Sequence, residues 1–174
     1  MRYGLIYFAA MLGMCQAAEE ENFEYTQFAA AMAFWGYTWE PIKLKTDDGW
    51  TLTTFHITGK RGEEEVERGE DLNPVIVNHG QSMDSVSLVL GKPLQREHLP
   101  LPMQLYDRGF DVYLPNNRGT QYSQVHDTLT VDDPEFWKFS WAEMGMYDAV
   151  SNVRMVKERT GKKVSWVGVS QGTV

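Results

Sequence analysis

The spacing of apolar residues changes from helical to alternating within the first third of the chain. Residues 28–34 (FAAAMAF) are rich in alanine, and we expect a helix there that ends at Gly36. Residues 42–57 place apolar side chains at alternating positions on either side of Asp47-Asp48-Gly49. This pattern predicts a β-hairpin, in which two antiparallel strands are joined by a tight turn.

Two short apolar runs without alternation follow, at residues 74–77 and 111–114. Such continuous runs are typical of strands buried on both faces, so we expect two parallel strands inside a sheet. The connection between them contains Leu99-Pro100-Leu101-Pro102, which argues against a regular helix at that point. Residues 103–108 are long enough to form a short helix before Gly109.

Helix signals are strongest in the segment after the second of these strands. Residues 133–139 predict one helical turn, with Asp133 as its cap and Pro134 at the first helical position. A longer helix is expected to begin at Ser140, because Glu143 three residues later completes a capping box.

Beyond the capping box, apolar residues recur at helical spacing until Thr160-Gly161 ends the helix. We expect this stripe to face a core; it consists of Met146, Ala149, Val150, Val153 and Val156. Residues 163–167 (KVSWV) are β-branched and aromatic, which predicts a strand buried on both faces.

This last strand leads directly into Gly168-Val169-Ser170-Gln171-Gly172, the G-x-S-x-G pattern of a nucleophile elbow. In an elbow the strand turns sharply into a helix, exposes the serine hydroxyl and leaves no room for side chains at the glycines. Ser170 is therefore the candidate nucleophile of an ester hydrolase. The histidine and acid that activate such a serine follow it in sequence in this fold. Only four residues follow Ser170, so we expect both to be missing from the chain.

The predicted elements occur in the order hairpin, strand, crossover, strand, helix, strand and elbow. This is the order of the first half of an α/β-hydrolase sheet, with parallel strands and right-handed crossovers. We therefore predict an α/β protein with a partial α/β-hydrolase fold. It comprises the N-terminal hairpin and the first parallel strands up to the nucleophile elbow.

Composition fits one globular domain preceded by a targeting segment. The chain has 174 residues, of which 43% are apolar. Residues 1–17 begin with a positive charge, continue as an apolar stretch too short for a stable membrane anchor, and end in small residues. We expect a signal peptide cleaved after Ala17; a buried helix and a lipid attached to Cys15 are the alternatives. Residues 18–174 would then be the N-terminal portion of an incomplete hydrolase domain without a transmembrane segment.

Charge and side-chain inventory disfavour several classes of function. The net charge of −8 disfavours nucleic acid, because its phosphates are bound by clustered lysine and arginine. Cys15 is the only cysteine, so residues 18–174 can form no internal disulfide. No phosphate-cradling loop occurs, and the histidines share no metal-ligand spacing, so we expect neither a cofactor nor a metal. The four histidines are His56, His79, His98 and His126.

Several further stretches resemble the acid lipase family of gastric and lysosomal lipases. Trp35-Gly36-Tyr37 and residues 46–52 (TDDGWTL) are similar to the opening hairpin of that family. Asn78-His79-Gly80 resembles its H-G loop, and residues 116–119 (NNRG) match its N-x-R-G stretch. Residues 141–148 (WAEMGMYD) are similar to its Y/W-x-E-M-x-x-Y-D helix start. With the elbow, these ordered matches extend from about residue 28 to residue 173.

The resemblance implies an oxyanion hole made of two backbone amides. In the family one N–H group follows the H-G pair and the other follows the nucleophile, which implies Gln81 and Gln171 here. Each such amide can stabilise a tetrahedral oxyanion by about 3 kcal/mol or more. The chain departs from the family at Gln81, where leucine is usual, and at Val169, where histidine is usual. Both departures keep the backbone N–H, but Gln81 makes the floor of the acyl pocket more polar.

The resemblance also implies a lipid ester hydrolase active in lipid catabolism. Its substrates would be neutral lipids such as triacylglycerols or steryl esters, met at a lipid–water interface, and it would be secreted or lysosomal. We expect residues 18–174 alone to be inactive, since the triad aspartate and histidine would be absent. The alternative is a truncated, catalytically inactive lipase-like remnant that binds lipid or a partner.

A few residues have two interpretations from the sequence alone. His79 is either a structural imidazole bonded to the H-G loop or a base within the chain. Arg118 and Asp148 are candidates for a buried ion pair. Four tryptophans either belong to the core or line a path for lipid: Trp35, Trp39, Trp137 and Trp141.

Overall fold

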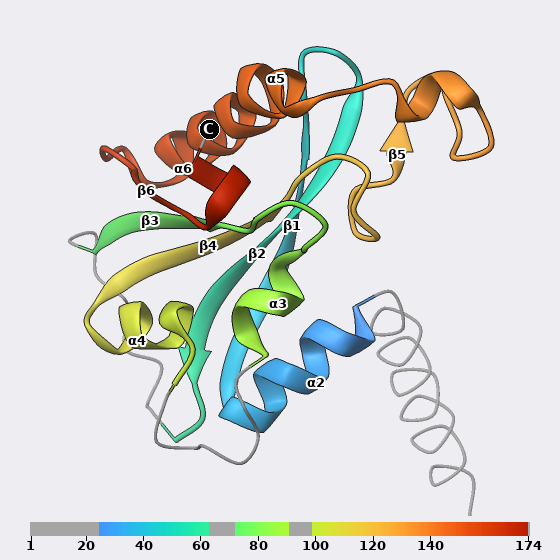
Figure 1. The fold of residues 1–174 in the computed structure, drawn as a ribbon. Coiled ribbons are helices and arrows are strands. Elements are labelled where there is room, and N and C mark those ends of the chain that lie inside the picture. The colour runs from blue at the N-terminus through green and yellow to red at the C-terminus, as the bar shows by residue number, and fades with distance from the viewer. Residues whose placement is uncertain (1–24, 63–71, 91–98, 174) are drawn as a thin grey trace, which may run out of the picture.

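The computed structural model describes residues 25–62, 72–90 and 99–173, which form a mixed β-sheet with helices on both of its faces (Figure 1). The predicted signal peptide at residues 1–17, with Cys15, and also His98 lie outside the described residues. Within the described ranges, no helix has the length and apolar character needed to cross a bilayer.

The N-terminal helix and hairpin form where the sequence predicts them. Helix α2 (Thr26–Trp35) ends at Gly36, whose φ of 80° is the left-handed conformation that glycine adopts without strain. Strands β1 (Tyr37–Lys45) and β2 (Trp50–Lys60) pair in antiparallel register. The turn between them uses Gly49, with φ of 93°. Both strands are longer than the alternating pattern indicated.

The sheet has the strand order β1-β2-β4-β3-β6, and the short β5 (Val125–His126) pairs with β2. Strand β3 (Asn73–Asn78) lies parallel to both β4 (Phe110–Asn116) and β6 (Ser165–Gly168), as predicted. One expectation is wrong: within the described residues β6 is an edge strand, and its Trp166 and Val167 are only partly buried. β-branched and aromatic residues predict that a strand forms, but they do not predict how many neighbouring strands it pairs with.

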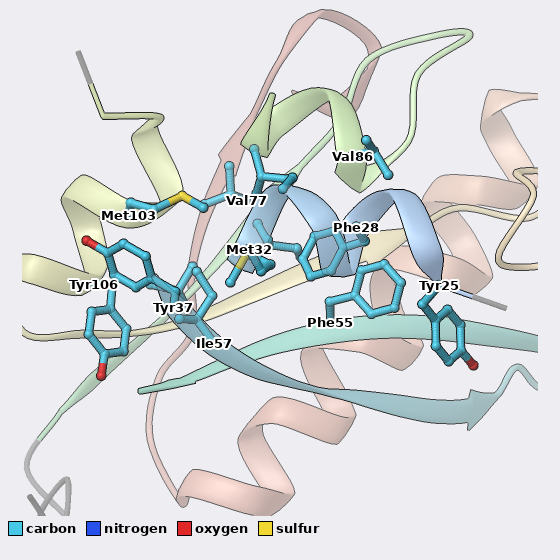
Figure 2. Packing of buried hydrophobic residues seen from close by; sticks show 14 of the residues in the cluster. Tyr25, Phe28, Met32, Tyr37, Phe55, Ile57, Val77, Val86, Met103 and Tyr106 are labelled. Carbon is cyan, nitrogen blue, oxygen red and sulfur yellow. The ribbon is translucent and has the colours of Figure 1, made fainter. Parts of the chain in front are cut away.

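The larger core lies between the sheet and helices α2, α3 (Ser85–Val89) and α4 (Leu101–Asp107). Figure 2 shows Phe28 of α2 against Phe55 of β2, and their ring centroids are 4.0 Å apart. Side chains alternate along β3, because Val77 faces this core whereas Ile76 packs with Val156 on the other face. Both faces of β3 are therefore buried, as its continuous apolar sequence predicts.

Residues 141–160 form one continuous helix with a wider turn inside it. It begins as α5 (Trp141–Glu143), continues as the π-helical segment η2 (Met144–Ala149), and ends as α6 (Val150–Thr160). The capping box is confirmed, because the Ser140 N–H donates to Glu143 Oε2 at 2.7 Å and the Ala142 N–H donates to Ser140 Oγ at 3.1 Å. Gly161 ends the helix with φ of 68°.

The apolar stripe of this helix does not face the core, contrary to the prediction, except at Val156. Met146, Val150 and Val153 are 57%, 45% and 36% exposed. The face against the sheet instead carries the polar residues Asp148, Ser151 and Asn152. The helix adopts this orientation because Asp148 and Asn152 have buried hydrogen-bond partners on distant segments, and the π-helical turns shift the helical register.

Two local details also differ from the sequence interpretation. Helix α4 begins at Leu101 and includes Pro102, because proline is tolerated in the first helical turn, where its missing N–H has no partner to lose. Asp133 precedes the short 3₁₀ helix η1 (Pro134–Trp137) but does not cap it. Its carboxylate accepts from the N–H of Thr130 at 2.7 Å instead.

Candidate active site

Strand β6 ends in a sharp turn that presents Ser170 to solvent. Ser170 has φ of 53°, a strained conformation for a residue with a Cβ atom, and it begins the 3₁₀ turn η3 (Ser170–Thr173). The turn is fastened to β3, because the N–H of Val169 donates to the carbonyl of Asn78 at 3.0 Å. A strained, exposed serine directly after a strand of a parallel pair is the geometry of a nucleophile elbow.

Both glycines of the G-x-S-x-G pattern lie where no side chain fits. A Cβ atom on Gly168 would sit 2.2 Å from the carbonyl oxygen of Gly172. A Cβ atom on Gly172 would sit 2.5 Å from the carbonyl oxygen of His79. Since both close neighbours are backbone atoms, they cannot rotate away. The steric role predicted for these glycines is confirmed.

The hydroxyl of Ser170 makes no hydrogen bond to another described residue. The three histidines in the described ranges contact residues other than Ser170. His56 contacts Glu40 and Asp111, His79 contacts Gly80, and His126 contacts the carbonyl of Asp48. None of these three imidazoles is therefore placed as a base for the serine.

The loop after β3 forms a tight turn beside the elbow. The N–H of Met83 donates to the carbonyl of Gly80 at 3.3 Å, and Ser82 in this turn has φ of 57°. The backbone N–H groups of Gln81 and Gln171 make no hydrogen bond within the described residues. Two unpaired backbone donors next to an exposed serine are what an oxyanion hole requires.

A cavity of about 770 Å³ adjoins these two amides, and both Gln81 and Gln171 line it. Its wall is mixed in character. Asp84 and Gln121 face it as a bonded pair, with Gln121 Nε2 donating to Asp84 Oδ2 at 2.7 Å. The apolar side chains in the lining are Met83, Val86, Leu90, Phe139, Trp141 and Met144. The volume is within the usual range for a site that binds a small molecule.

His79 is a structural imidazole, the first of the two interpretations given above. It is 3% exposed, its Nε2 accepts from the N–H of Asn117 at 3.2 Å, and its Nδ1 lies 2.9 Å from the carbonyl oxygen of Gly80. Because Nε2 accepts, the ring proton is on Nδ1, where it donates to Gly80. Burial lowers the pKa of His79 below its ordinary value, which agrees with a neutral ring.

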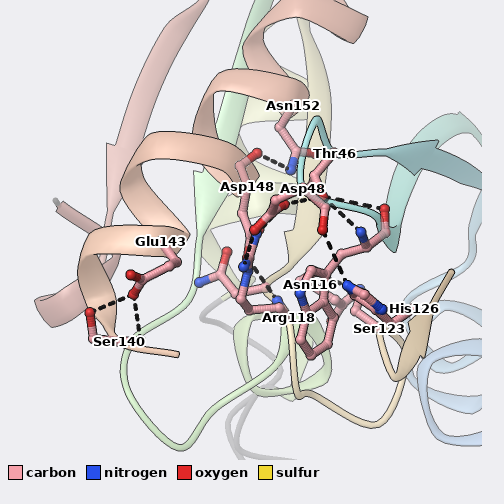
Figure 3. Close-up of polar contacts among 12 residues, drawn as sticks. Thr46, Asp48, Asn116, Arg118, Ser123, His126, Ser140, Glu143, Asp148 and Asn152 are labelled. Carbon is pink, nitrogen blue, oxygen red and sulfur yellow. Dashed lines mark hydrogen bonds and ion pairs between the residues drawn. The ribbon is translucent and has the colours of Figure 1, made fainter. Parts of the chain in front are cut away.

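Arg118 is buried between two carboxylates, as Figure 3 shows. Its Nε donates to Asp148 at 2.8 Å, and its two terminal nitrogens donate to Asp48 at 2.7 and 2.9 Å. The predicted pair with Asp148 is confirmed, and Asp48 is an additional partner that the sequence gave no reason to expect. Arg118 thereby connects the β1–β2 turn to the helix that starts beside the pocket.

The two carboxyl groups around Arg118 differ in their pKa. Burial raises the pKa of Asp48, but hydrogen bonds from Arg118 and Thr46 outweigh it, so the net pKa lies below the ordinary value. For Asp148, which is fully buried, desolvation dominates and raises the pKa.

Three of the four tryptophans divide between the core and the cavity lining. Trp35 and Trp39 pack against the large core, and Trp35 Nε1 donates to the carbonyl of Val89 at 2.9 Å. Trp141 lines the cavity and is 61% exposed. Trp137 is 45% exposed and its Nε1 donates to the carbonyl of Val131.

Several residues of the site carried no sequence signal. Ser82 and Asp84 follow the H-G pair in a segment without a recognisable pattern, and their roles depend on backbone strain and on a distant glutamine. For Asn78 the sequence indicates only that it precedes His79 in the H-G loop. The carbonyl and the side chain of Asn78 both contact the elbow. One of its partners there, Gly172, is 94 residues away in the sequence.

The chain matches a known family in its first half. Residues 28–91 match the family described as a partial alpha/beta-hydrolase lipase region. Lipase member M of Mus musculus is 35% identical over 139 residues, covering 79% of this chain and 32% of that protein. The lysosomal acid lipase/cholesteryl ester hydrolase of Homo sapiens is 35% identical over 146 residues, covering 82% and 34%.

Gastric triacylglycerol lipase of Bos taurus is also 35% identical, over 143 residues and 82% of this chain. The chain spans about a third of the length of these curated relatives. Among solved structures, the esterase Pf2001 of Pyrococcus furiosus aligns with a TM-score of 0.50 and 16% identity, covering 81% of this chain and 46% of that one. This structural similarity supports the fold.

Proposed function

Because this chain belongs to the acid lipase family of the α/β-hydrolases, we propose that it provides the nucleophile and oxyanion hole of a lipid ester hydrolase. One observation carries the proposal. Ser170 is exposed with φ of 53°, between two glycines that admit no side chain, beside a cavity lined by the proposed oxyanion residues. The substrates proposed are neutral lipid esters such as triacylglycerols or steryl esters.

The proposed chemistry is acyl transfer. The Ser170 oxygen attacks the ester carbonyl carbon while a base removes its proton, and the carbonyl oxygen becomes an oxyanion. The N–H groups of Gln81 and Gln171 donate to that oxyanion, and each contributes about 3 kcal/mol or more in a dry site. Collapse of the intermediate expels the alcohol with the proton from the base, and water then hydrolyses the acyl-serine. The base and its acid would come from outside the described residues.

The rim of the cavity supports contact with a lipid surface. Met83, Leu90 and Trp141 line the cavity and are 39%, 65% and 61% exposed. Exposed apolar side chains grouped around a pocket favour an apolar partner over water. Gln81, in contrast, places a polar side chain at the same pocket. A secreted or lysosomal location and a role in lipid catabolism belong to the same proposal.

The test is covalent labelling of the serine. In the protein expressed from its complete gene, a fluorophosphonate probe should label Ser170, and Ser170→Ala should abolish both labelling and ester turnover. Thr173→Ala is a matched control in the same turn, because it removes a hydroxyl that donates to the carbonyl of Ser170. Turnover that persists in Ser170→Ala would contradict the assignment.

A catalytically inactive lipid-binding protein is the second candidate, since Ser170 has no base within the described residues. Residues 18–174 are expected to show less than about one-thousandth of the rate of a complete lipase, because the serine would lack its base. Lipid binding by that segment without turnover, together with an unlabelled serine in the complete protein, would favour this candidate.

A further inference from the structure

Asn78, the last residue of β3, holds the elbow through both its backbone and its side chain. It is 3% exposed, its carbonyl accepts from the N–H of Val169 at 3.0 Å, and its Nδ2 donates to the carbonyl of Gly172 at 3.5 Å. The same Gly172 carbonyl accepts from Trp166 Nε1 at 2.8 Å. Asn78 is therefore packed against both ends of the turn that carries Ser170.

The other side-chain atom of Asn78, Oδ1, is buried and has no hydrogen-bond partner among the described residues. Exchanging the amide oxygen and nitrogen would not solve this, because it would place Oδ1 against the carbonyl oxygen of Gly172. Buried polar atoms are almost always hydrogen-bonded to protein or to an ordered water, since a lost hydrogen bond is not replaced by solvent. We therefore expect Oδ1 of Asn78 to accept a hydrogen bond from a donor.

A second, small cavity adjoins Asn78. Its volume is about 10 Å³, close to the minimum for one water molecule. It is lined by Asn78, Asn117, Trp141, Met144 and Gln171, and all of these except Asn78 also line the large pocket. The side-chain amides of Asn117 and Gln171 form no hydrogen bond within the described residues. The site thus offers three polar side chains in a space the size of one water.

We propose that this cavity is the binding site of a single ordered water, which donates to Oδ1 of Asn78 and bonds the side-chain amides of Asn117 and Gln171. A buried water commonly makes two to four such bonds. It joins the carboxyl ends of β3 and β4 to the residue that follows Ser170. Asn78 is thereby a positioning residue for Gln171. This last consequence rests on the proposed function, whereas the water site does not.

The direct test is a crystal structure of this chain at a resolution that shows individual waters. We expect a water within about 3.2 Å of Asn78 Oδ1. The same water should be present in Ser170→Ala, so the result does not depend on whether Ser170 is catalytic. A dry cavity, or an Asn78 amide with Nδ2 facing it, would overturn the proposal. Occupation of the cavity by a protein side chain would do the same.

A double-mutant cycle gives a second, independent test. Asn117→Leu removes a polar partner of the water but keeps the backbone bonds of Asn117 to His79 and Thr120. It should lower Tm by about 3 to 8 °C, because it removes one of the hydrogen bonds that hold the water against Oδ1 of Asn78. Once Asn78→Leu has removed that acceptor, Asn117→Leu should cost much less.

Additivity decides the outcome of this cycle. The combined variant should be markedly more stable than the sum of the two single changes predicts. The control is the pair Asn117→Leu and Lys60→Gln, whose effects should add. Lys60 pairs with Asp107 and does not line the small cavity. If Asn78→Leu and Asn117→Leu are also additive, no shared water links them, and the proposal fails. Should Asn78→Leu not fold, the crystallographic test still decides.

Discussion

Gly80 and Ser170 lie in direct contact, so that a Cβ atom on Gly80 would be 3.3 Å from the Cβ of Ser170 and 3.0 Å from the carbonyl oxygen of Val169. The two residues are far apart in sequence, and they meet because β3 and β6 are neighbouring parallel strands whose carboxyl ends share one edge of the sheet. The turn proposed to hold one oxyanion donor is therefore packed against the turn that holds the nucleophile.

Replacing Gly80 by alanine should impair catalysis more than stability. The added methyl group must move the turn by a few tenths of an ångström against backbone atoms, and this displaces the proposed N–H donor of Gln81. In the complete protein we expect at least about a tenfold loss of kcat, since one oxyanion donor is worth about 10²- to 10³-fold. Esterase kinetics and thermal melting measure the two effects separately.

Gly161→Ala is the matched control for Gly80→Ala. Gly161 has φ of 68°, but a Cβ atom there would meet nothing within 4 Å. Alanine at that position should cost about 1 kcal/mol of stability through backbone strain, with kcat unchanged. An active Gly80→Ala enzyme would show that the turn is not part of the catalytic machinery.

Substitutions at Arg118 should destabilise the protein strongly. Arg118→Lys loses the planar fork that bonds Asp48 and Asp148, and we expect a loss of about 3 kcal/mol in the free energy of unfolding. Arg154→Lys is the control, because Arg154 makes a solvent-exposed pair with Asp47 in the same turn and should change little. Urea unfolding of both variants measures the difference, and equal effects would argue against a structural role for Arg118.

His79 should make stability fall as the solution becomes acidic. Its pKa in the folded protein lies below the ordinary value of 6.5, because burial disfavours the charged imidazole. The unfolded chain therefore binds more protons just below pH 6.5, so the stabilisation present above that pH is lost as pH falls toward the folded pKa. Melting temperatures between pH 7.5 and 5 should decline less steeply in His79→Gln. An unchanged slope would mean that His79 is not held neutral.

Ser82 is expected to be a site of stored strain. Ser82 and Ser170 are the only described residues other than glycine with positive φ, and Ser82 lines the large cavity. Ser82→Gly should raise the free energy of unfolding by up to about 1 kcal/mol, because glycine adopts this conformation freely. Ser82→Val should lower it, since β-branched residues tolerate positive φ poorly. Chemical unfolding measures both effects. If Ser82→Gly lowers the free energy of unfolding and Ser82→Val raises it, the turn has another conformation in solution.

The sequence by itself determined the order of elements and the position of the elbow. The helix ending at Gly36, the hairpin turn at Gly49 and the capping box of Ser140 with Glu143 all depend on interactions between residues a few positions apart. The same is true of the steric need for glycine at position 168, where a Cβ atom would meet the backbone of Gly172 four residues later. Short-range rules of this kind can be applied to a sequence without knowing the fold.

Only the tertiary structure decided which side chains the helix at residues 141–160 buries. Its apolar stripe predicted a buried face, but Asp148 and Asn152 are buried instead, because Arg118 and Thr54 from other segments satisfy them. The small cavity beside Asn78 is likewise lined by Asn117 and Gln171, which come from distant parts of the chain. Burying a polar group is favourable only when a partner is present, and sequence periodicity carries no information about partners from distant segments.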